Sequence, residues 1–282
     1  MKLNEIYSTN KTIISYEVFP PKSEAENLLK EIEILSKHNP AFISLTYGAG
    51  GGENKSFSLM EMIKDENVSI MPHFTCITSS KENIEENMNK LKQLGIDKIL
   101  ALRGDIPQDK TLMKHDFHHA NELVSFLKEK TNLSIGAAGY PEGHIESPDM
   151  RTDIENLKKK VDAGADAIFT QLFFDNEFFY DYVNRVRAAE ITIPVIAGIM
   201  PVISEKQVNK MVSMANISVP KKLQHGLEKY KDKDLIEFGI DFATEQCCDL
   251  IKNNVKGLHF YTLDKSYSTN KILENLKCEN LL

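Results

Sequence analysis

The sequence predicts an α/β protein built as a (β/α)8 barrel. Eight short apolar segments alternate with longer amphipathic segments along 282 residues, a length typical of this barrel. The apolar segments are rich in Ile, Val, Phe and Ala and lack regular polar alternation, as strands buried on both faces of a parallel sheet do. Unusual polar residues stand where these segments end. In a barrel such ends converge on one mouth, whereas the competing doubly wound sheet would spread them along an edge.

The eight predicted strands each end near a residue that stands out from its apolar surroundings. The strands are predicted at 13–19, 41–46, 69–75, 98–102, 134–139, 167–172, 194–198 and 257–261. The residues at or just past their ends are Glu17, Thr46, His73, Arg103, Tyr140, Gln171, Pro201 and Tyr261.

Amphipathic helices are predicted between the strands. The segment 81–93 places Ile84, Met88 and Leu91 on one face, and Gly95 ends it. A capping box at 23–26 opens another helix, and further helices are predicted at 116–130, 149–163, 176–189, 205–214, 221–230 and 234–253. Because no linker, low-complexity tract or internal repeat interrupts this pattern, we expect a single domain over residues 1–282.

Composition argues against several functional classes. The chain has 34 basic and 41 acidic residues and a formal charge of −7, whereas nucleic-acid binders need a basic surface to displace phosphate counterions. No apolar run approaches a membrane span, and the N-terminus lacks the apolar core of a signal peptide. The four cysteines form no CxxC pair and no zinc-site spacing. We expect a cytoplasmic protein with no nucleic-acid or membrane partner and no metal.

The end of the first strand carries a candidate acid. Glu17 lies in an apolar stretch, and burial there would raise its pKa and suit it to donate a proton near neutral pH. A strand-end glutamate paired with a nearby Lys or Arg explains the same residue, and this stretch alone slightly favours that explanation.

Three loops that follow strands carry candidate ligand contacts. The run that begins at Thr46 is rich in glycine, which lets backbone amides approach a ligand, although it does not match GxGxxG. The motif Arg103-Gly104-Asp105 suits anion binding, and an ion pair that closes the loop explains it equally well. Tyr140 and His144 stand in one short loop, which favours a site.

Several other polar residues have good structural explanations. His73 is more often a hydrogen-bonded structural histidine than a metal ligand, because no second ligand stands at a fixed spacing. Asp153 and Asn156 can share a helix face. Lys159 and Lys160 could reach phosphates, although a solvated face is the better explanation for the lysines alone.

The sixth strand carries a candidate ligand contact, whereas the histidine-rich loop earlier in the chain is expected to carry none. Gln171 can both donate and accept hydrogen bonds, which suits a polar heterocycle, while Phe173 and Phe174 are expected in the core. His115, His118 and His119 lie in a charged loop and are expected at a solvated surface.

Eight short motifs occur in a fixed order over nearly the whole chain. They are Glu17-Val18-Phe19-Pro20-Pro21, Thr46-Tyr47-Gly48-Ala49-Gly50-Gly51, His73 with Thr75-Cys76, Arg103-Gly104-Asp105, Gly139-Tyr140-Pro141-Glu142-Gly143-His144, Thr170-Gln171-Leu172-Phe173-Phe174-Asp175, Gly198-Ile199-Met200-Pro201 and His259-Phe260-Tyr261-Thr262. Each motif is weak alone, but the ordered set is very specific. The chain resembles the methylenetetrahydrofolate reductase family in its bacterial single-domain form.

The resemblance implies a (β/α)8 TIM barrel that holds FAD at its C-terminal mouth. It implies reduction of 5,10-methylenetetrahydrofolate to 5-methyltetrahydrofolate, a step that leads towards methionine synthesis. NADH or NADPH would reduce FAD and leave, and the folate would then take the hydride in a ping-pong reaction. A homo-oligomer is also implied.

The resemblance assigns roles to individual residues. Glu17 matches the general acid that protonates a folate nitrogen, and Asp105 matches an acid whose charge would stabilise the resulting cationic iminium. The positions that match flavin contacts are Thr46, Tyr47, His73, Arg103, Asp105, Tyr140, His144, Asp153, Asn156, Lys159 and Lys160. Besides Glu17, the positions that match substrate contacts are Gln171, Gln207, Met211, Tyr261 and Lys265.

The chain departs from the family pattern at a few positions. Met211 replaces a phenylalanine that packs against the dinucleotide in some bacterial members, and a methionine stacks less well. Asp264-Lys265 replaces Asn-Arg, and Lys159 replaces an arginine whose guanidinium can bind a phosphate with two parallel hydrogen bonds.

Two alternative functions stay open on the sequence. In the first, the chain is an FAD-binding reductase subunit that receives electrons from a partner protein rather than directly from NAD(P)H. In the second, Glu17, His73, Asp105 and His144 build a metal-dependent lyase or aldolase, although their scattered spacing argues against it.

Overall fold

The eight strands close a parallel barrel, which confirms the predicted fold. The computed structural model describes residues 1–20, 25–46, 53–65 and 68–282, and the strands pair in sequence order until β8 meets β1. The strands are β1 Ile13–Val18, β2 Ile43–Leu45, β3 Ile70–Thr75, β4 Lys98–Leu102, β5 Ser134–Gly139, β6 Ala167–Leu172, β7 Val195–Ile199 and β8 Gly257–Tyr261. Each bound lies within two residues of its prediction.

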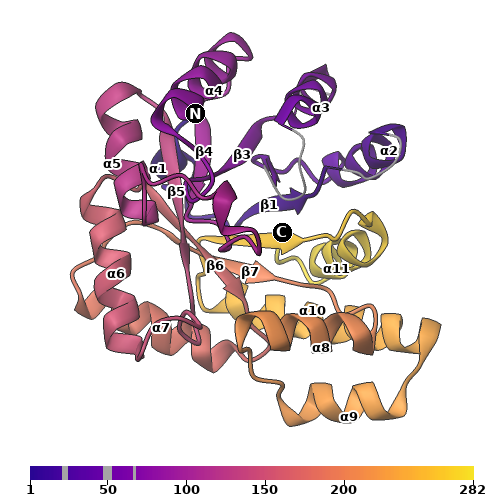
Figure 1. Cartoon of the computed structure of the whole chain (residues 1–282). Helices are drawn as coiled ribbons and strands as arrows, with labels where there is room; N and C mark the ends of the chain where they lie inside the picture. The colour runs from indigo at the N-terminus through magenta and orange to yellow at the C-terminus, as the bar shows by residue number, and fades with distance from the viewer. Residues whose placement is uncertain (21–24, 47–52, 66–67) are drawn as a thin grey trace.

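Helices surround the barrel, with α8, α9 and α10 gathered on one side (Figure 1). The α-helices are α1 Leu3–Ile6, α2 Ala25–Ser36, α3 Glu53–Asp65, α4 Lys81–Gln93, α5 Ala120–Lys130, α6 Met150–Asp162, α7 Asn176–Ala188, α8 Glu205–Ala215, α9 Lys221–Lys229, α10 Asp232–Lys252 and α11 Ser266–Cys278, and Lys110–Leu112 forms a short 3-10 helix. No helix among the described residues is long and apolar enough to cross a membrane.

Helices α1, α3 and α11 were not predicted. Helix α1 spans only four residues, too few to show a periodic pattern, and it is stabilised by the burial of Leu3 and Ile6. Helices α3 and α11 begin with four or five mostly polar residues, which dilute the helical hydrophobic pattern in the sequence.

Two apolar layers position the strand ends. The larger layer lies between the strands and the helices, and the predicted inward residues Ile84, Met88 and Leu91 of α4 are buried in it. A smaller cluster fills the N-terminal part of the barrel interior, where Leu3 and Ile6 pack against Leu100, Phe169 and Ile196. Helix α1 therefore closes the bottom of the barrel, opposite the mouth at which the strands end.

Side chains of β1 alternate between these layers. Tyr16 and Val18 join the outer layer, while Ser15 and Glu17 lie on the interior side. In the β1–β8 register Ser15 stands opposite His259, and in the β1–β2 register Glu17 stands opposite Ser44. Barrel closure thus brings polar residues from the first and last strands together.

Candidate active site

A cavity of about 1280 Å³ opens at the C-terminal ends of the strands. Its described walls come from Thr46 after β2, the ends of β3 to β5 and the loops that follow these three strands, the first turn of α5, and the face of α6 from Asp153 to Lys160. The predicted site residues that line it are Thr46, His73, Arg103, Asp105, Tyr140, His144, Asp153, Asn156, Lys159 and Lys160. Tyr47 lies outside the described residues.

Lys160 provides a half-buried positive charge at the cavity. Its Nζ donates a hydrogen bond to the carbonyl of Ala138 at 2.6 Å and lies 5.7 Å from the centre of the Tyr140 ring. Burial lowers the pKa of Lys160 to about 8, and the nearby carboxylate of Asp153 opposes this shift. Burial also raises the pKa of Asp153, while Lys160 and a hydrogen bond from Ser147 act against it. The cavity wall therefore holds a partly desolvated lysine and a partly desolvated aspartate, each of which favours the charged form of the other.

Gly104 sets the direction of the loop that carries Arg103 and Asp105. Its φ of +84° lies in the left-handed region, and a Cβ there would come within 2.9 Å of Thr75 Cβ. The Arg103 guanidinium reaches across to the next loop, where Nη2 donates to Glu146 Oε1 at 2.8 Å in a two-pronged pair. Hydrogen bonding from Arg103 lowers the pKa of Glu146. The pair seen here joins two loops, whereas Asp105 is exposed and lines the cavity.

Thr46 directly follows β2 and carries an unsatisfied hydroxyl. Its side chain is 8% exposed, and Oγ1 has no hydrogen-bond partner among the described residues. A buried polar atom without a partner is costly, so a hydroxyl at a cavity wall is well placed to bind a ligand atom or a water.

Glu17 lies inside the barrel next to a residue of the cavity wall. Its Oε2 is 3.4 Å from His73 Nε2 and 3.8 Å from His259 Nε2, and its side chain is 10% exposed. Burial lowers the pKa of His73, with the charge of Glu17 opposing the shift, so His73 is neutral at neutral pH. Among the described residues Glu17 faces two histidines and forms no ion pair with a Lys or Arg, in contrast to the pairing that the sequence slightly favoured.

The sequence similarity to known proteins extends over the whole barrel. A model of methylenetetrahydrofolate reductase matches residues 2–277. The chain belongs to the methylenetetrahydrofolate reductase family. It is 37% identical over 260 residues to the 5,10-methylenetetrahydrofolate reductase of Pectobacterium carotovorum subsp. carotovorum, covering 90% of this chain and 86% of the relative. The Escherichia coli K12 protein of the same name is 35% identical over 271 residues, with 93% and 90% covered.

Longer members of the family match the same region. Methylenetetrahydrofolate reductase (NADH) 1 of Arabidopsis thaliana is 37% identical over 296 residues, which cover 98% of this chain but 50% of the relative. The chain thus spans about half the length of this plant relative. A solved structure of an uncharacterized Clostridium thermocellum protein that binds two copies of 5-methyl-5,6,7,8-tetrahydrofolic acid has a TM-score of 0.72 at 14% identity, with 99% and 98% covered, and shares the fold.

The remaining family-matched positions lie outside the cavity lining. Tyr261 Oη donates to the carbonyl of Thr170 at 2.7 Å, and Gln171 Oε1 accepts from the amide of Leu172 at 2.9 Å. The Gln207 side chain bonds the carbonyl of Pro201 and the amide of Ile203, which fixes the loop before α8.

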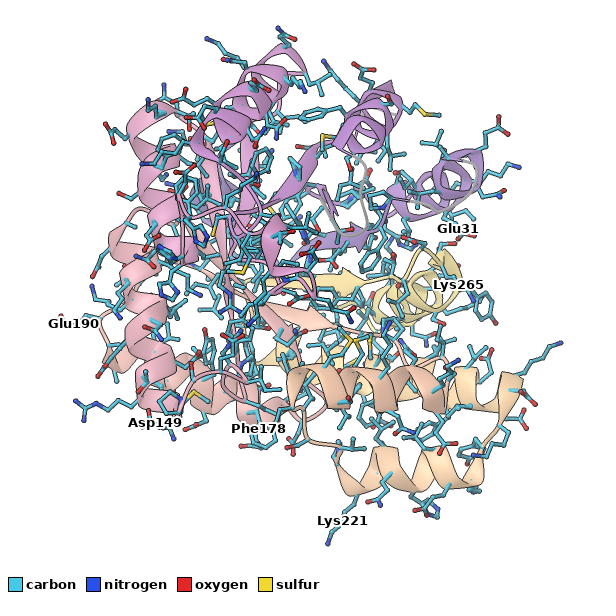
Figure 2. The ribbon with its side chains drawn as sticks, viewed as in Figure 1. Glu31, Asp149, Phe178, Glu190, Lys221 and Lys265 are labelled. Atoms are coloured by element: carbon cyan, nitrogen blue, oxygen red, sulfur yellow. The ribbon has the colours of Figure 1, made fainter. Side chains whose placement is uncertain are left out.

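Met211 and Lys265 lie further from the barrel axis. Met211 packs against the apolar cluster shared by α8, α9 and α10. Lys265 is exposed at the start of α11, close to Glu31 of α2, which accepts a hydrogen bond from the amide of Ser266 at 2.7 Å (Figure 2).

Sequence reasoning missed three residues of this region. Glu146 and His259 stood in or next to recognised motifs, but no local signal named their partners. His119, expected at a solvated surface, is exposed and also lines the cavity. Phe173 and Phe174 are buried as predicted. Within the described part of the chain, no group of three or more His, Cys, Asp or Glu side chains is arranged to hold a metal ion.

Proposed function

We propose that this chain is a flavoprotein that reduces 5,10-methylenetetrahydrofolate to 5-methyltetrahydrofolate, with NADH or NADPH as the hydride donor. The observation that carries the proposal is that a large cavity lined by Arg103, Lys159 and Lys160 lies beside a buried carboxylic acid at one barrel mouth. Membership of the family supports the same reaction. When bound, FAD would take a hydride from the nicotinamide and supply it to the folate.

The residues of the cavity fit FAD. The volume of about 1280 Å³ exceeds the roughly 300–1,000 Å³ of common small-molecule pockets, which suits a dinucleotide. Arg103, Lys159 and Lys160 offer positive charge for the pyrophosphate, and the unpartnered hydroxyl of Thr46 offers a polar contact. Asp153 and Asn156 add acceptors and an amide from one helix face.

Glu17 would supply the proton that the folate half-reaction needs. In the proposed step, protonated Glu17 gives its proton to a nitrogen of the five-membered ring, the C–N bond opens, and the methylene carbon becomes part of a cationic iminium. The hydride then completes the methyl group. Asp105 would stabilise the cation by its negative charge. Burial lowers the pKa of His73, so the imidazole 3.4 Å from Glu17 is neutral at neutral pH.

Anaerobic stopped-flow absorbance tests the proposal with the purified chain. We expect a yellow protein that bleaches with NADH or NADPH and regains its colour with methylenetetrahydrofolate. A colourless protein that takes up no FAD would contradict the proposal. Reduction by dithionite but by neither nicotinamide, followed by reoxidation with the folate, would instead favour electron transfer from a partner protein.

Glu17→Gln tests the acid. The amide keeps the size of the side chain but has no acidic proton, so we expect the folate half-reaction to slow by at least about 100-fold. Flavin reduction by the nicotinamide should stay within about threefold, because that step needs no proton from Glu17. Glu33→Gln on the exposed face of α2 is the matched control and should alter neither rate. Equal losses in both half-reactions would exclude the acid role.

A further inference from the structure

The ion pair between Arg103 and Glu146 lies in the wall of the cavity that the proposed cofactor would fill. Both residues line this cavity, Arg103 in the loop after β4 and Glu146 in the loop after β5. Their side chains are 23% and 49% exposed. A carboxylate of the chain itself therefore binds a cation that the proposed function offers to a pyrophosphate.

Both edges of the Arg103 guanidinium that could bind an anion with two hydrogen bonds are in use. Carboxylates and phosphates bind a guanidinium best through two parallel N–H donors. Nη1 and Nη2 donate to the two carboxylate oxygens of Glu146, Nη2 at 2.8 Å, and Nε donates to the carbonyl oxygen of Gly104 at 3.2 Å. A phosphate that binds Arg103 in the two-pronged manner must therefore displace an acceptor that is already present.

The backbone holds Glu146 and Arg103 close to each other. The amide of Glu146 donates to His144 Nδ1 at 3.1 Å, and the amide of Ser147 donates to the carbonyl of His144 at 2.8 Å. In the other loop, the amide of Ile77 donates to the carbonyl of Arg103 at 2.9 Å. Because both loops are fixed, the Glu146 carboxylate competes for the guanidinium as a tethered group with a high effective concentration.

The Glu146 carboxylate is charged, yet a strong ligand can displace it. Hydrogen bonding from Arg103 lowers the pKa of Glu146, so the carboxylate is ionised at neutral pH. Its side chain is about half exposed, so water can replace the guanidinium as its partner, and exposed ion pairs are weak. The charges of Arg103 and Lys160 both act on His144, so the two cations influence the same part of the cavity. A pyrophosphate that contacts both cations gains more than an anion that reaches Arg103 alone.

We propose that Glu146 is a specificity-determining residue of the cavity, because its carboxylate occupies the anion-binding edge of Arg103 until the pyrophosphate of a dinucleotide displaces it. The cost of this displacement lowers the affinity of every anion at Arg103 by the same factor. Small anions, which make few other contacts, are thereby excluded, whereas a dinucleotide makes enough contacts to bind. The inference rests on the proposed function, since it assigns the pyrophosphate of the cofactor to this guanidinium.

Glu146→Gln tests the competition. The amide keeps the size of the side chain but is uncharged and has one acceptor oxygen instead of two, so it holds the guanidinium less strongly. We expect the flavin-free full chain with this change to bind inorganic pyrophosphate and FAD about threefold to fivefold more tightly than wild type. Isothermal titration calorimetry at fixed pH and ionic strength measures both dissociation constants. If Glu146 instead positioned Arg103, or supported the loop, the change would weaken binding.

A double-mutant cycle with Arg103→Met separates competition from simple charge repulsion. Without the guanidinium there is no partner to compete for, so Glu146→Gln should alter the FAD dissociation constant by less than about 1.5-fold in this background. An equal gain in both backgrounds would show that only a negative charge near the ligand was removed, which overturns the competition. Glu155→Gln breaks another Arg–Glu pair, with Arg151 outside the cavity lining, and should change neither dissociation constant.

The two ligands distinguish failure of the inference from failure of the proposed function. If FAD binds neither wild type nor Glu146→Gln, the proposed function fails, and the pyrophosphate titration alone decides the role of Glu146. If FAD binds but Glu146→Gln leaves the affinity for pyrophosphate unchanged or lowers it, the competition is overturned and the proposed function stands. Pyrophosphate that binds to neither protein also overturns the inference, because Arg103 is then no site for this anion.

Discussion

Lys160 shows how one residue combines burial with a charge that the proposed cofactor needs. Its ammonium is desolvated within the cavity wall, and its pKa falls to about 8, so it is largely charged at neutral pH and loses its proton under mildly alkaline conditions. A phosphate close to Nζ would favour the charged form. Binding of the proposed cofactor at this residue would therefore be coupled to proton uptake.

We expect the affinity for FAD to fall as pH rises through about 8. The charged form of Lys160 is present below this pKa and is lost above it, and only the charged form attracts a pyrophosphate. Lys160→Met should weaken FAD binding by about tenfold at pH 7 and remove this step from the pH dependence. Flavin fluorescence titrations measure both effects. Lys158→Met, on the same helix but outside the cavity lining, should keep the step; an unchanged step in Lys160→Met would contradict the assignment.

At the scale of single elements, helix α10 packs closely against the loop after β7. Gly239 of α10 lies so close to this loop that a Cβ would come within 2.0 Å of the carbonyl oxygen of Val202. The same loop is tied to Gln207 by the carbonyl of Pro201 and the amide of Ile203. A long helix on the outside of the barrel thus fixes the segment between β7 and α8.

Gly239→Ala should destabilise the fold although alanine favours helices by roughly 1 kcal/mol over glycine. The new methyl group meets a backbone carbonyl that is held by the packing of α10, and overpacking of this kind costs about 1–3 kcal/mol or more. Urea unfolding followed by circular dichroism measures the free energy of unfolding. Asp241→Ala, at an exposed position on the same helix, should change it by less than about 0.5 kcal/mol. A stabilised Gly239→Ala variant would show that the loop can move.

At the scale of the whole molecule, the two ends of the barrel carry different tasks. The mouth gathers the charged cavity and the acid, while the bottom is sealed by α1, whose residues Leu3 and Ile6 pack against the apolar barrel interior. Changes at the bottom are therefore expected to alter stability rather than binding.

Leu3→Ala tests this division. Removal of a fully buried leucine side chain should cost about 2–5 kcal/mol of unfolding free energy, because a cavity remains under the barrel. The dissociation constant of FAD, measured below the melting temperature, should stay within about twofold of wild type. Asn4→Ala, exposed on the same short helix, should leave both quantities nearly unchanged. A parallel loss of FAD affinity in Leu3→Ala would show that the two ends are coupled.

Hydrophobic periodicity and the order of the motifs predicted the fold class and the positions of all eight strands. The strand bounds agree within two residues, because short apolar runs and glycine stops are local signals of a parallel sheet. The cavity lining also matches the candidate positions at the ends of β2 to β5 and on α6, since the ends of parallel strands meet at one mouth. Helix α1 was not predicted because burial under the barrel, and not a local sequence pattern, stabilises its four residues.

By itself, the sequence determined the barrel, the strand ends and the family. Only the tertiary structure decided which side chains face one another. Arg103 forms its ion pair with Glu146 of the next loop and not with Asp105. Glu17 lies close to both His73 and His259. Ser15 and His259 are 244 residues apart, and no local pattern links them. They meet because closure of the barrel fixes the register of β1 against β8, and that register is a property of all eight strands together.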